Sequence, residues 1–418
     1  MLKIIENPCH DESDRPALED LARKGAQQML KTALEAEVAE YVETHDDQRD
    51  EEGHALVVRN GRARARKIVT GSGVLDVEVP RVNDRRVDVA GNRCRFTSKI
   101  LPPYMRRSPK VDEVLPILYL RGLSSGDFRE ALPALLGEDA AGLSASTITR
   151  LTGRWQREYD GFHRRDLSES RYAYIWCDGI HVRIRLEDER LCLLVMLGVR
   201  EDGSKELIAV EDGYRESKES WLAVLRDLKT RGMKPPAVAV GDGALGFWSA
   251  VTEVWPQTCE QRCWFHRIGN ILDKLPKRLQ GRAKQALREI MYAETKADAQ
   301  AATKAFEHEY GAKYPKAVAS LLRDQDKSLT FFDFPAEHWK HLRTTNLVES
   351  PFATVRLRQR ITKGAGSRTK GLTMAFKLLE MAQKRWRRIN GPELLPLVIA
   401  GVEFKDGVQQ ETKEDRAA

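Results

Sequence analysis

The stretch from Asp242 to His266 carries the residue types best suited to chemistry. Asp242 follows an apolar run, residues 237–240, that predicts a buried strand, and Cys263-x-x-His266 closes the stretch. A carboxylate at the end of a buried strand is costly unless protons, hydrogen bonds or a metal ion compensate its charge. The stretch therefore predicts a bound cation with Asp242 as one of its ligands.

Two other acids extend this site. Asp178 lies on the apolar face of a strand predicted over 174–186, although an edge position or a turn at Gly179 would also explain it. Glu349 falls in a later predicted helix. Pro351 cannot donate a helical hydrogen bond, so Glu349 must lie in the first turn of that helix or beside a kink.

Three carboxylates at strand, strand and helix positions predict metal-dependent phosphoryl transfer. Mg²⁺ takes oxygen ligands, and two such ions can hold the attacking and leaving oxygens of an in-line displacement. Positioning and charge then dominate the catalysis. Without a His or Cys nucleophile, hydrolysis and transesterification of phosphodiesters fit this set best. One acid among the chain's 62 Asp and Glu residues is a weak signal, so the prediction rests on all three together.

The Cys-x-x-His pair also allows a zinc site. Cys263 and His266, with Cys259 four residues before Cys263, would supply one half, and His338 and His341 are candidates for the other. No second pair has suitable spacing, so zinc is disfavoured. We expect Cys263 to be buried, and His266 to lie beside the metal ions or a DNA phosphate.

Composition limits the protein class. A chain of 418 residues is long enough for two or three domains. Its longest apolar run, Leu191–Val199, is about half of a membrane span, so no transmembrane helix is expected. Acids near the N-terminus argue against a signal peptide, and six unevenly spaced cysteines do not form a disulfide framework. We therefore expect a cytoplasmic protein.

The net charge of +7 is unevenly distributed. Residues 351–390 hold eleven Lys or Arg against one acid, and residues 51–120 hold fourteen against eight. Residues 1–50 hold six against thirteen acids. Separate basic blocks indicate a polyanionic partner for particular surfaces, whereas any one block could also be a solvated helix face.

The pattern of elements predicts an α/β core of the ribonuclease-H-like type with a mixed sheet. Three successive strands, a helix and a buried, parallel strand at 237–241 give its order, with the fourth strand beside the first. An α-helical insertion interrupts the core, and a mostly helical DNA-binding region precedes it. The expected segments are a helical region at 1–54, a basic strand and loop region at 55–110, a helix-turn-helix at 111–165, the core at 166–275 and 341–395, the insertion at 276–340, and a disordered tail at 404–418.

The helix-turn-helix prediction rests on three short helical patterns that follow the first basic block. Ser144 is a suitable N-cap for the third, which would be the recognition helix. Ser146, Thr147 and Arg150 would then lie near its start and contact DNA. Packing of three helices into an ordinary bundle is the alternative.

The motifs together resemble the Mutator-type DDE transposases of bacterial insertion sequences. The likeness spans about residues 15 to 395 and is carried by several separated motifs. These are Asp242-x-x-x-Gly246-Phe247, Trp255-Pro256, Gln261-x-Cys263-x-x-His266, Thr344-Thr345-Asn346 with Glu349, Phe352-Ala-Thr-Val-Arg356, Thr362-Lys363-Gly-Ala-Gly-Ser367, Arg59-Asn-Gly61 and Val79-Pro-Arg81. A signature of this length is more specific than any short motif.

The resemblance implies a catalytic triad of Asp178, Asp242 and Glu349 that binds two Mg²⁺ or Mn²⁺ ions. It also implies double-stranded DNA as the partner, binding to the terminal inverted repeats of the element, and a homodimer on DNA. Cleavage would free a 3′-hydroxyl, which then attacks target DNA. The expected phosphate contacts are Arg356, Arg358, Arg360, Lys363 and Arg368.

Two other protein classes share parts of this pattern. A ribonuclease-H-like nuclease or resolvase would use the same acids without a module that reads inverted repeats. A DNA-binding regulator that had lost catalysis would be expected to lack one of the three acids, and this chain keeps all three. A helper driven by nucleotide hydrolysis is disfavoured, because the sequence has no Gly-x-x-x-x-Gly-Lys-Ser/Thr loop.

Overall fold

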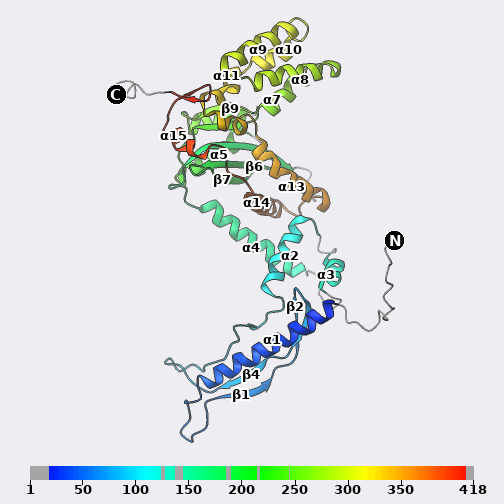
Figure 1. Cartoon of the computed structure of the whole chain (residues 1–418), viewed down its shortest axis with the longest axis vertical. Helices are drawn as coiled ribbons and strands as arrows, with labels where there is room; N and C mark the ends of the chain where they lie inside the picture. The colour runs from blue at the N-terminus through cyan, green and yellow to red at the C-terminus, as the bar shows by residue number, and fades with distance from the viewer. Residues whose placement is uncertain are drawn as a thin grey trace, which may run out of the picture. The chain divides into compact units, whose positions relative to one another are not determined.

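The computed structural model describes residues 18–123, 128–136, 145–184, 190–213, 217–243 and 245–410. The chain forms two compact units, Met1–Ile148 and Thr149–Ala418 (Figure 1). The division lies inside a long helix, α4 (Ala145–Arg164), and therefore within the segment predicted at 111–165. The finer segments expected from the sequence remain predictions.

The smaller unit combines a long helix with two hairpin-like pairs of strands. Strands β1 and β4 pair antiparallel, as do β2 and β3, which the turn residues Gly71 and Ser72 connect. Its elements are α1 (Leu18–Glu43), β1 (Val57–Arg62), β2 (Arg66–Thr70), β3 (Gly73–Val77), β4 (Pro80–Asp84), α2 (Pro109–Arg121) and α3 (Phe128–Leu136). Helix α2 ends at Gly122, whose φ of 132° favours glycine.

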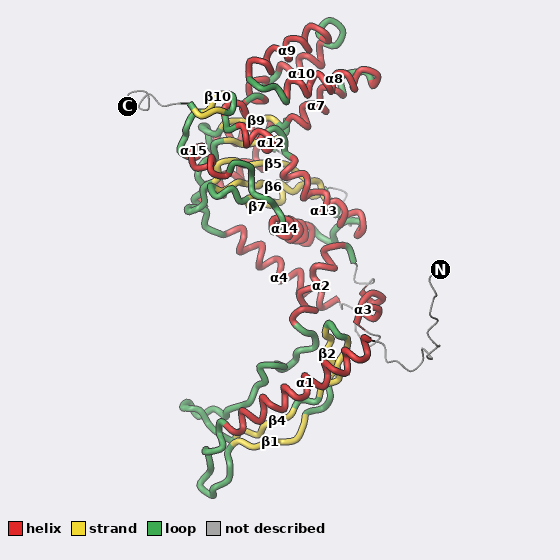
Figure 2. The backbone as a smooth tube through the Cα atoms, viewed as in Figure 1, coloured by secondary structure: helices red, strands yellow, loops and turns green. Residues whose placement is uncertain are grey.

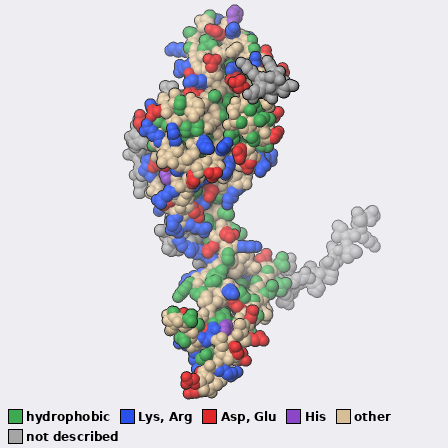
Figure 3. All heavy atoms as spheres, turned by 90° about the vertical axis from the view of Figure 1, so that its left-hand side faces the viewer, with side chains coloured by type: hydrophobic (Ala, Val, Ile, Leu, Met, Phe, Trp, Pro, Cys, Tyr) green, Lys and Arg blue, Asp and Glu red, His purple; other side chains and the backbone are tan. Residues whose placement is uncertain are grey.

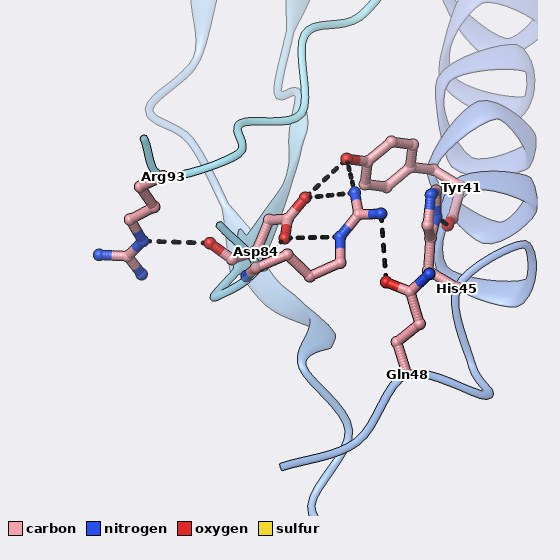
Figure 4. Close-up of polar contacts among 6 residues, drawn as sticks. Tyr41, His45, Gln48, Asp84 and Arg93 are labelled. Carbon is pink, nitrogen blue, oxygen red and sulfur yellow. Dashed lines mark hydrogen bonds and ion pairs between the residues drawn. The ribbon is translucent and has the colours of Figure 1, made fainter. Parts of the chain in front are cut away.

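A buried ion pair connects α1 to the end of β4 (Figure 4). The Asp84 carboxylate is 1% exposed and accepts hydrogen bonds from Tyr41 Oη at 2.7 Å and from Arg86 Nη2 at 2.7 Å. Hydrogen bonds from Arg86 are the largest cause that holds the pKa of Asp84 well below its usual range. Every partner of the buried carboxylate is thus a donor, as burial of a charge requires.

The larger unit is built on a five-stranded mixed sheet in the order β7-β6-β5-β8-β9. Strand β6 is antiparallel to β5 and β7, whereas β8 is parallel to both β5 and β9. The predicted neighbourhood of the first and fourth strands of the core is therefore confirmed. The strands are β5 (Tyr172–Val182), β6 (Leu191–Arg200), β7 (Lys205–Gly213), β8 (Val238–Gly241) and β9 (Cys259–Arg262).

Helices cover both faces of this sheet (Figure 2). One face packs its odd-numbered β5 residues, such as Ile175 and Cys177, against α5 (Lys218–Thr230) and α6 (Leu245–Val254). On the other face, Trp176 Nε1 donates to the carbonyl of His341. That face meets α12 (Trp339–Leu342), α13 (Asn346–Thr362), α14 (Arg368–Gln383) and α15 (Leu395–Ile399). The alternation of strand residues thus decides that Asp178, two residues after Trp176, faces the helices that follow residue 338.

The segment between the sheet and α13 is helical, as the sequence predicts for 276–340. Figure 1 shows α8, α9 and α10 grouped together near β9. Their buried faces carry Leu287, Phe306 and Leu321. The elements are α7 (Trp264–Leu272), α8 (Lys277–Met291), α9 (Lys296–Tyr310), α10 (Pro315–Leu322), α11 (Gln325–Ser328) and the short 3₁₀ helices Thr330–Asp333 and Ala336–His338.

The described end of the chain adds a 3₁₀ turn, Pro392–Leu394, and a two-stranded pair, β10 (Phe404–Lys405) with β11 (Val408–Gln409). The predicted tail at 404–418 therefore begins with ordered strands, which corrects that part of the prediction, and residues 411–418 lie outside the described residues. Figure 3 shows one face of the molecule, on which Lys and Arg side chains are interspersed with acids.

Candidate active site

Two neighbouring parallel strands bring the first two acids together. In the β5–β8 pair, Trp176 lies opposite Val240. The same register two residues further sets Asp178 beside Asp242, which directly follows the end of β8. Neighbouring strands are roughly 4.8 Å apart, so these carboxylates share one edge of the site.

The first turn of α13 supplies the third acid. Glu349 lies in that turn, and its backbone N–H donates to the carbonyl of Thr345 at 3.1 Å. Pro351 is accommodated inside the helix without displacing Glu349 from the first turn, one of the two arrangements that the sequence allowed. Because α13 packs on β5, Glu349 faces the strand that carries Asp178.

The pKa of Asp178 shows that the three carboxylates interact. Burial is the largest cause that raises this pKa to about 7, and the charges of Asp242 and Glu349 raise it further. The charge of His266 and a 2.9 Å hydrogen bond from the Gly179 N–H act in the opposite direction. Burial therefore disfavours the charged form of Asp178, and a cation bound beside it would favour that form.

A buried contact chain holds Glu349 in place. The Thr345 side chain, fully buried, donates from Oγ1 to Glu349 Oε1 at 2.7 Å. The Thr345 N–H donates to Cys263 Sγ at 3.3 Å, and Oγ1 lies 3.2 Å from the same sulfur. A hydroxyl has one hydrogen, so with that hydrogen on Glu349 the thiol donates to Oγ1. Cys263 is buried, as the sequence predicts, and supports the start of α13.

His266 places a positive charge at the edge of the acidic cluster. Its Nε2 lies 3.9 Å from Glu349 Oε1. Its proximity to Cys263 is the largest cause that raises the pKa of His266 to about 9, followed among the raising causes by the charges of Glu349 and Asp178. No full hydrogen bond with the thiol forms, because Nδ1 is buried without a hydrogen-bond partner. The raised pKa favours the charged form of His266, which would offset part of the negative charge of Glu349 and Asp178.

His338 and His341 do not complete a zinc site with Cys263 and His266. Cys263 Sγ, His266 and Glu349 offer donor atoms within 4.8 Å of one another. Both ring nitrogens of His338 are engaged elsewhere, with Tyr174 Oη at 2.7 Å and the Gly391 carbonyl at 2.9 Å. His341 Nε2 accepts from the Asn390 N–H. Cys263, His266 and Glu349 are, among the described residues, the group of donor atoms close enough to hold a metal ion, so the preference for Mg²⁺ or Mn²⁺ on the three carboxylates stays a prediction.

The basic side chains after Glu349 are of two kinds: some are exposed, and others are buried or paired with an acid. Arg356, Arg360 and Lys363 are exposed, as phosphate contacts must be. Arg358 is 2% exposed, so the expected surface contact with DNA is not available at this position. It lies on the same helix as Arg356 and Arg360, but on the side that faces the core. Arg368 is partly buried and donates from Nη2 and Nε to Asp212, at 2.6 and 3.0 Å.

The helix-turn-helix remains a prediction. Helices α2, α3 and α4 follow one another as expected, and Arg150 is exposed on α4. The connections at 124–127 and 137–144 lie outside the described residues, as do the side chains of Ser146 and Thr147. The turns that would distinguish a recognition helix from a bundle helix therefore lie outside the described residues.

Strand β9 was not predicted from the sequence, although it positions both Cys263 and His266. Its residues, Cys-Glu-Gln-Arg, lack the apolar alternation that identifies a strand. Gln261 nevertheless is fully buried and donates from Nε2 to the Ser328 carbonyl at 3.1 Å, and its Oε1 accepts from the Phe331 N–H at 2.8 Å. The sequence signal that could have indicated this strand was Gln261, two residues before the buried Cys263.

The fold and the site define a class of protein: a mixed α/β domain with one acid within β5, one directly after β8 and one on a covering helix. Comparison with known families is more specific. The family described as "Transposase, Mutator family" matches residues 7–387. The chain belongs to the Mutator family of transposases, which confirms the resemblance seen in the motifs.

Individual relatives agree with this assignment. The chain is 60% identical over 297 residues to the transposase for insertion sequence element IS6120 of Mycolicibacterium smegmatis, covering 71% of this chain and 92% of that protein. It is 48% identical over 281 residues to the transposase for element IST2 of Acidithiobacillus ferrooxidans, covering 67% and 95%. Membership of this family implies action on DNA, by cutting and joining.

One solved structure aligns loosely. The Drosophila P element transposase strand transfer complex matches with a TM-score of 0.28 and 11% identity, over 74% of this chain and 85% of that chain. A match with so low a TM-score does not define the fold, so the fold assignment rests on the strand order of the sheet. Among the described residues, no helix is long and apolar enough to span a membrane.

Proposed function

We propose that this protein is a DDE transposase with a ribonuclease-H-like core, whose acids are Asp178, Asp242 and Glu349. The convergence of these three carboxylates, through the β5–β8 register and the packing of α13 on β5, is the observation that carries the proposal. Its substrates would be the terminal inverted repeats of its own insertion sequence and a target DNA, met in the bacterial cytoplasm at the nucleoid. A homodimer on DNA would bring the two ends of the element together.

Asp178, Asp242 and Glu349 would together hold two Mg²⁺ or Mn²⁺ ions, as the resemblance to DDE transposases implies. When bound, such ions stabilise the charge that develops on the attacking and leaving oxygens of a phosphodiester. The protein's own contribution is to fix the three carboxylates, through the β5–β8 register and through Thr345.

Two displacements at phosphorus account for transposition. In the first, water attacks the phosphodiester at the end of the element, and the bond to the 3′-oxygen breaks to free a 3′-hydroxyl. In the second, that hydroxyl attacks a target phosphodiester and the displaced oxygen leaves as the new strand end, so the number of phosphodiester bonds is conserved. The imidazolium of His266 would hold positive charge beside Glu349 while DNA approaches.

The test uses the full chain, Mg²⁺ and a labelled duplex carrying one end of the element, identified by sequencing the DNA that flanks the gene. Wild-type protein should give nicked and strand-transferred products. Asp242→Asn should retain DNA binding and lose both products, by a factor of at least 10³, because a ligand to the metal is removed. Arg226→Ala, exposed on α5 on the opposite face of the sheet, is the control and should remain active.

The alternatives predict other products. A nuclease or resolvase would cut without joining, and a regulator without catalysis would bind without cutting. Strand transfer that survives in all of Asp178→Asn, Asp242→Asn and Glu349→Gln would overturn the triad.

A further inference from the structure

A pocket of about 460 Å³ lies next to the acidic cluster and has no role in the proposed cleavage chemistry. Helix α7 and helix α8 form its walls, and Thr344 and Asn346 close it at the start of α13. His266 belongs both to this pocket and to the acidic cluster, because its Nε2 is 3.9 Å from Glu349 Oε1. A group bound in the pocket would thus sit within reach of the reacting phosphate.

Two exposed aromatic rings line this pocket. Phe265 is 59% exposed and Tyr292 is 61% exposed, although most large apolar side chains of this unit are buried. Helix α7 buries Trp264, Ile268 and Ile271, so Phe265 lies outside its buried face. One exposed apolar residue means little, but two aromatic rings on one pocket indicate a binding surface.

One of these rings, that of Tyr292, contacts a cationic side chain. The guanidinium carbon of Arg343 lies 5.1 Å from the centre of the Tyr292 ring and 4.7 Å from that of Phe331, which is buried. The cation–π contact fixes the orientation of the tyrosine ring at little entropic cost. A rigid, exposed aromatic face is a stacking platform rather than a loose surface side chain.

The polar groups of the pocket match a nucleotide. Lys284 and Arg288 lie one turn apart on exposed positions of α8 and form no ion pair with any residue that the structure describes. Asn270, Asp273 and Asn346 add hydrogen-bonding groups, of which the Asp273 carboxylate is an acceptor only. Aromatic faces suit a base, the amide and carboxylate groups suit its polar edge, and the two cations suit its phosphates.

We propose that this pocket receives one DNA base turned out of the duplex beside the phosphodiester that is cut. This inference rests on the proposed function, because it assigns the pocket to the same DNA. Turning a base out costs stacking and pairing energy, which stacking on Phe265 and Tyr292 would return. The unstacked step would also open the DNA backbone where the three carboxylates must reach the phosphate.

A glycine in the pocket wall permits a clean test. Gly269 lines the pocket four residues after Phe265, and a side chain added there meets nothing within 4 Å. Gly269→Leu should therefore fill the pocket, and leucine is a better helix former than glycine, so α7 should persist. Gly281→Leu is the matched control, because Gly281 lies on α8, also has open space around it and does not line the pocket.

The experiment measures binding of the full chain to a duplex with the element end and its flank, in Ca²⁺ to suppress cleavage. An abasic analogue replaces one nucleotide at a time around the cleaved bond. At one position the abasic analogue should weaken wild-type and Gly281→Leu binding by about five- to a hundredfold, the range expected for loss of base–aromatic stacking. Gly269→Leu should bind intact and abasic DNA within twofold of each other, and Tyr292→Ala should behave similarly.

The two proposals fail differently. If the wild-type protein in Mg²⁺ neither cuts nor joins element ends, the proposed function is wrong. If wild-type protein cuts and joins, but no position shows more than a twofold abasic effect, the pocket does not hold a base. An abasic effect equally large in Gly269→Leu and in wild-type protein would also overturn the inference, because the base would then be held elsewhere.

Discussion

At the scale of single residues, Glu349 depends on two side chains, Thr345 and Cys263, for its position. Thr345 donates to Glu349 Oε1, and Cys263 holds Thr345 through its backbone N–H and its hydroxyl. These contacts fix which oxygen of the carboxylate remains free to face Asp178. Groups that orient a metal ligand in this way typically change metal affinity or activity about 10–100-fold when they are removed.

We therefore expect Thr345→Val to lower the rate of DNA cleavage by roughly 10–100-fold and to raise the Mg²⁺ concentration needed for half-maximal rate. Valine has the shape of threonine without the hydroxyl, so the loss reports the hydrogen bond. Thr345→Ser keeps the hydroxyl and should restore most of the activity. A Mg²⁺ titration of cleavage separates this positioning role from a loss of folding, and an unchanged half-maximal concentration in Thr345→Val would contradict it.

At the scale of elements, a buried carboxylate joins α4 to β7. Glu211 Oε1 lies 2.8 Å from His163 Nδ1, and its Oε2 accepts from Tyr159 Oη at 3.2 Å. Burial is the largest cause that raises the pKa of Glu211, against the lowering effects of His163 and Tyr159. The folded protein therefore keeps the Glu211 proton to a higher pH than the unfolded chain does.

This shift has a definite sign for stability. The contribution of a carboxyl whose pKa is raised by folding is fully present below its unfolded pKa and is lost as pH rises through the folded value. Glu211→Gln keeps an acceptor for Tyr159 and cannot ionise.

The melting temperature of Glu211→Gln relative to wild type should thus rise steadily between pH 5 and pH 8. Thermal unfolding of metal-free protein, followed by circular dichroism at each pH, measures the difference. Glu289→Gln, on an exposed position of α8, is the control and should show no such trend. A difference that stays constant over this range would show that Glu211 does not titrate differently in the folded and unfolded states.

At the scale of the whole molecule, charge in the basic block after Glu349 is divided between surface and interior. Arg356 and Arg360 are exposed on α13, whereas Arg358 is buried. Of these three arginines, only Arg356 and Arg360 are available to DNA phosphates. Each neutralised phosphate adds about 0.9 to the slope of log affinity against log salt concentration.

The double variant Arg356→Ala/Arg360→Ala should accordingly bind DNA more weakly and reduce this slope by about 1.8. Fluorescence anisotropy at several salt concentrations measures both quantities. Arg226→Ala, an exposed arginine on α5 that pairs with Glu253, should leave the slope unchanged. Arg358→Met should instead lower the thermal stability with the slope intact, and a slope that falls in Arg358→Met would contradict the assignment of this side chain to the interior.

The strand order, the insertion and the family could be predicted because their signals are local. Alternation identifies β5, a continuous apolar run identifies β6, a helical pattern identifies α5, and the motifs from Asp242 to His266 identify the family. Strand β9 escaped prediction, since its only fully buried side chain is a glutamine whose partners, Ser328 and Phe331, lie more than sixty residues away. Local patterns carry no information about such partners.

The sequence by itself thus determined the family, through its motifs, and it predicted Asp178, Asp242 and Glu349 as the acids of one site. Tertiary structure alone decided that Cys263 supports Glu349 through Thr345, that Arg358 faces inward, and that Phe265 and Tyr292 line one pocket. The physical reason is that charge, burial and stacking depend on distances between side chains. Packing of α7, α8 and α13 sets those distances, and no spacing along the chain encodes them.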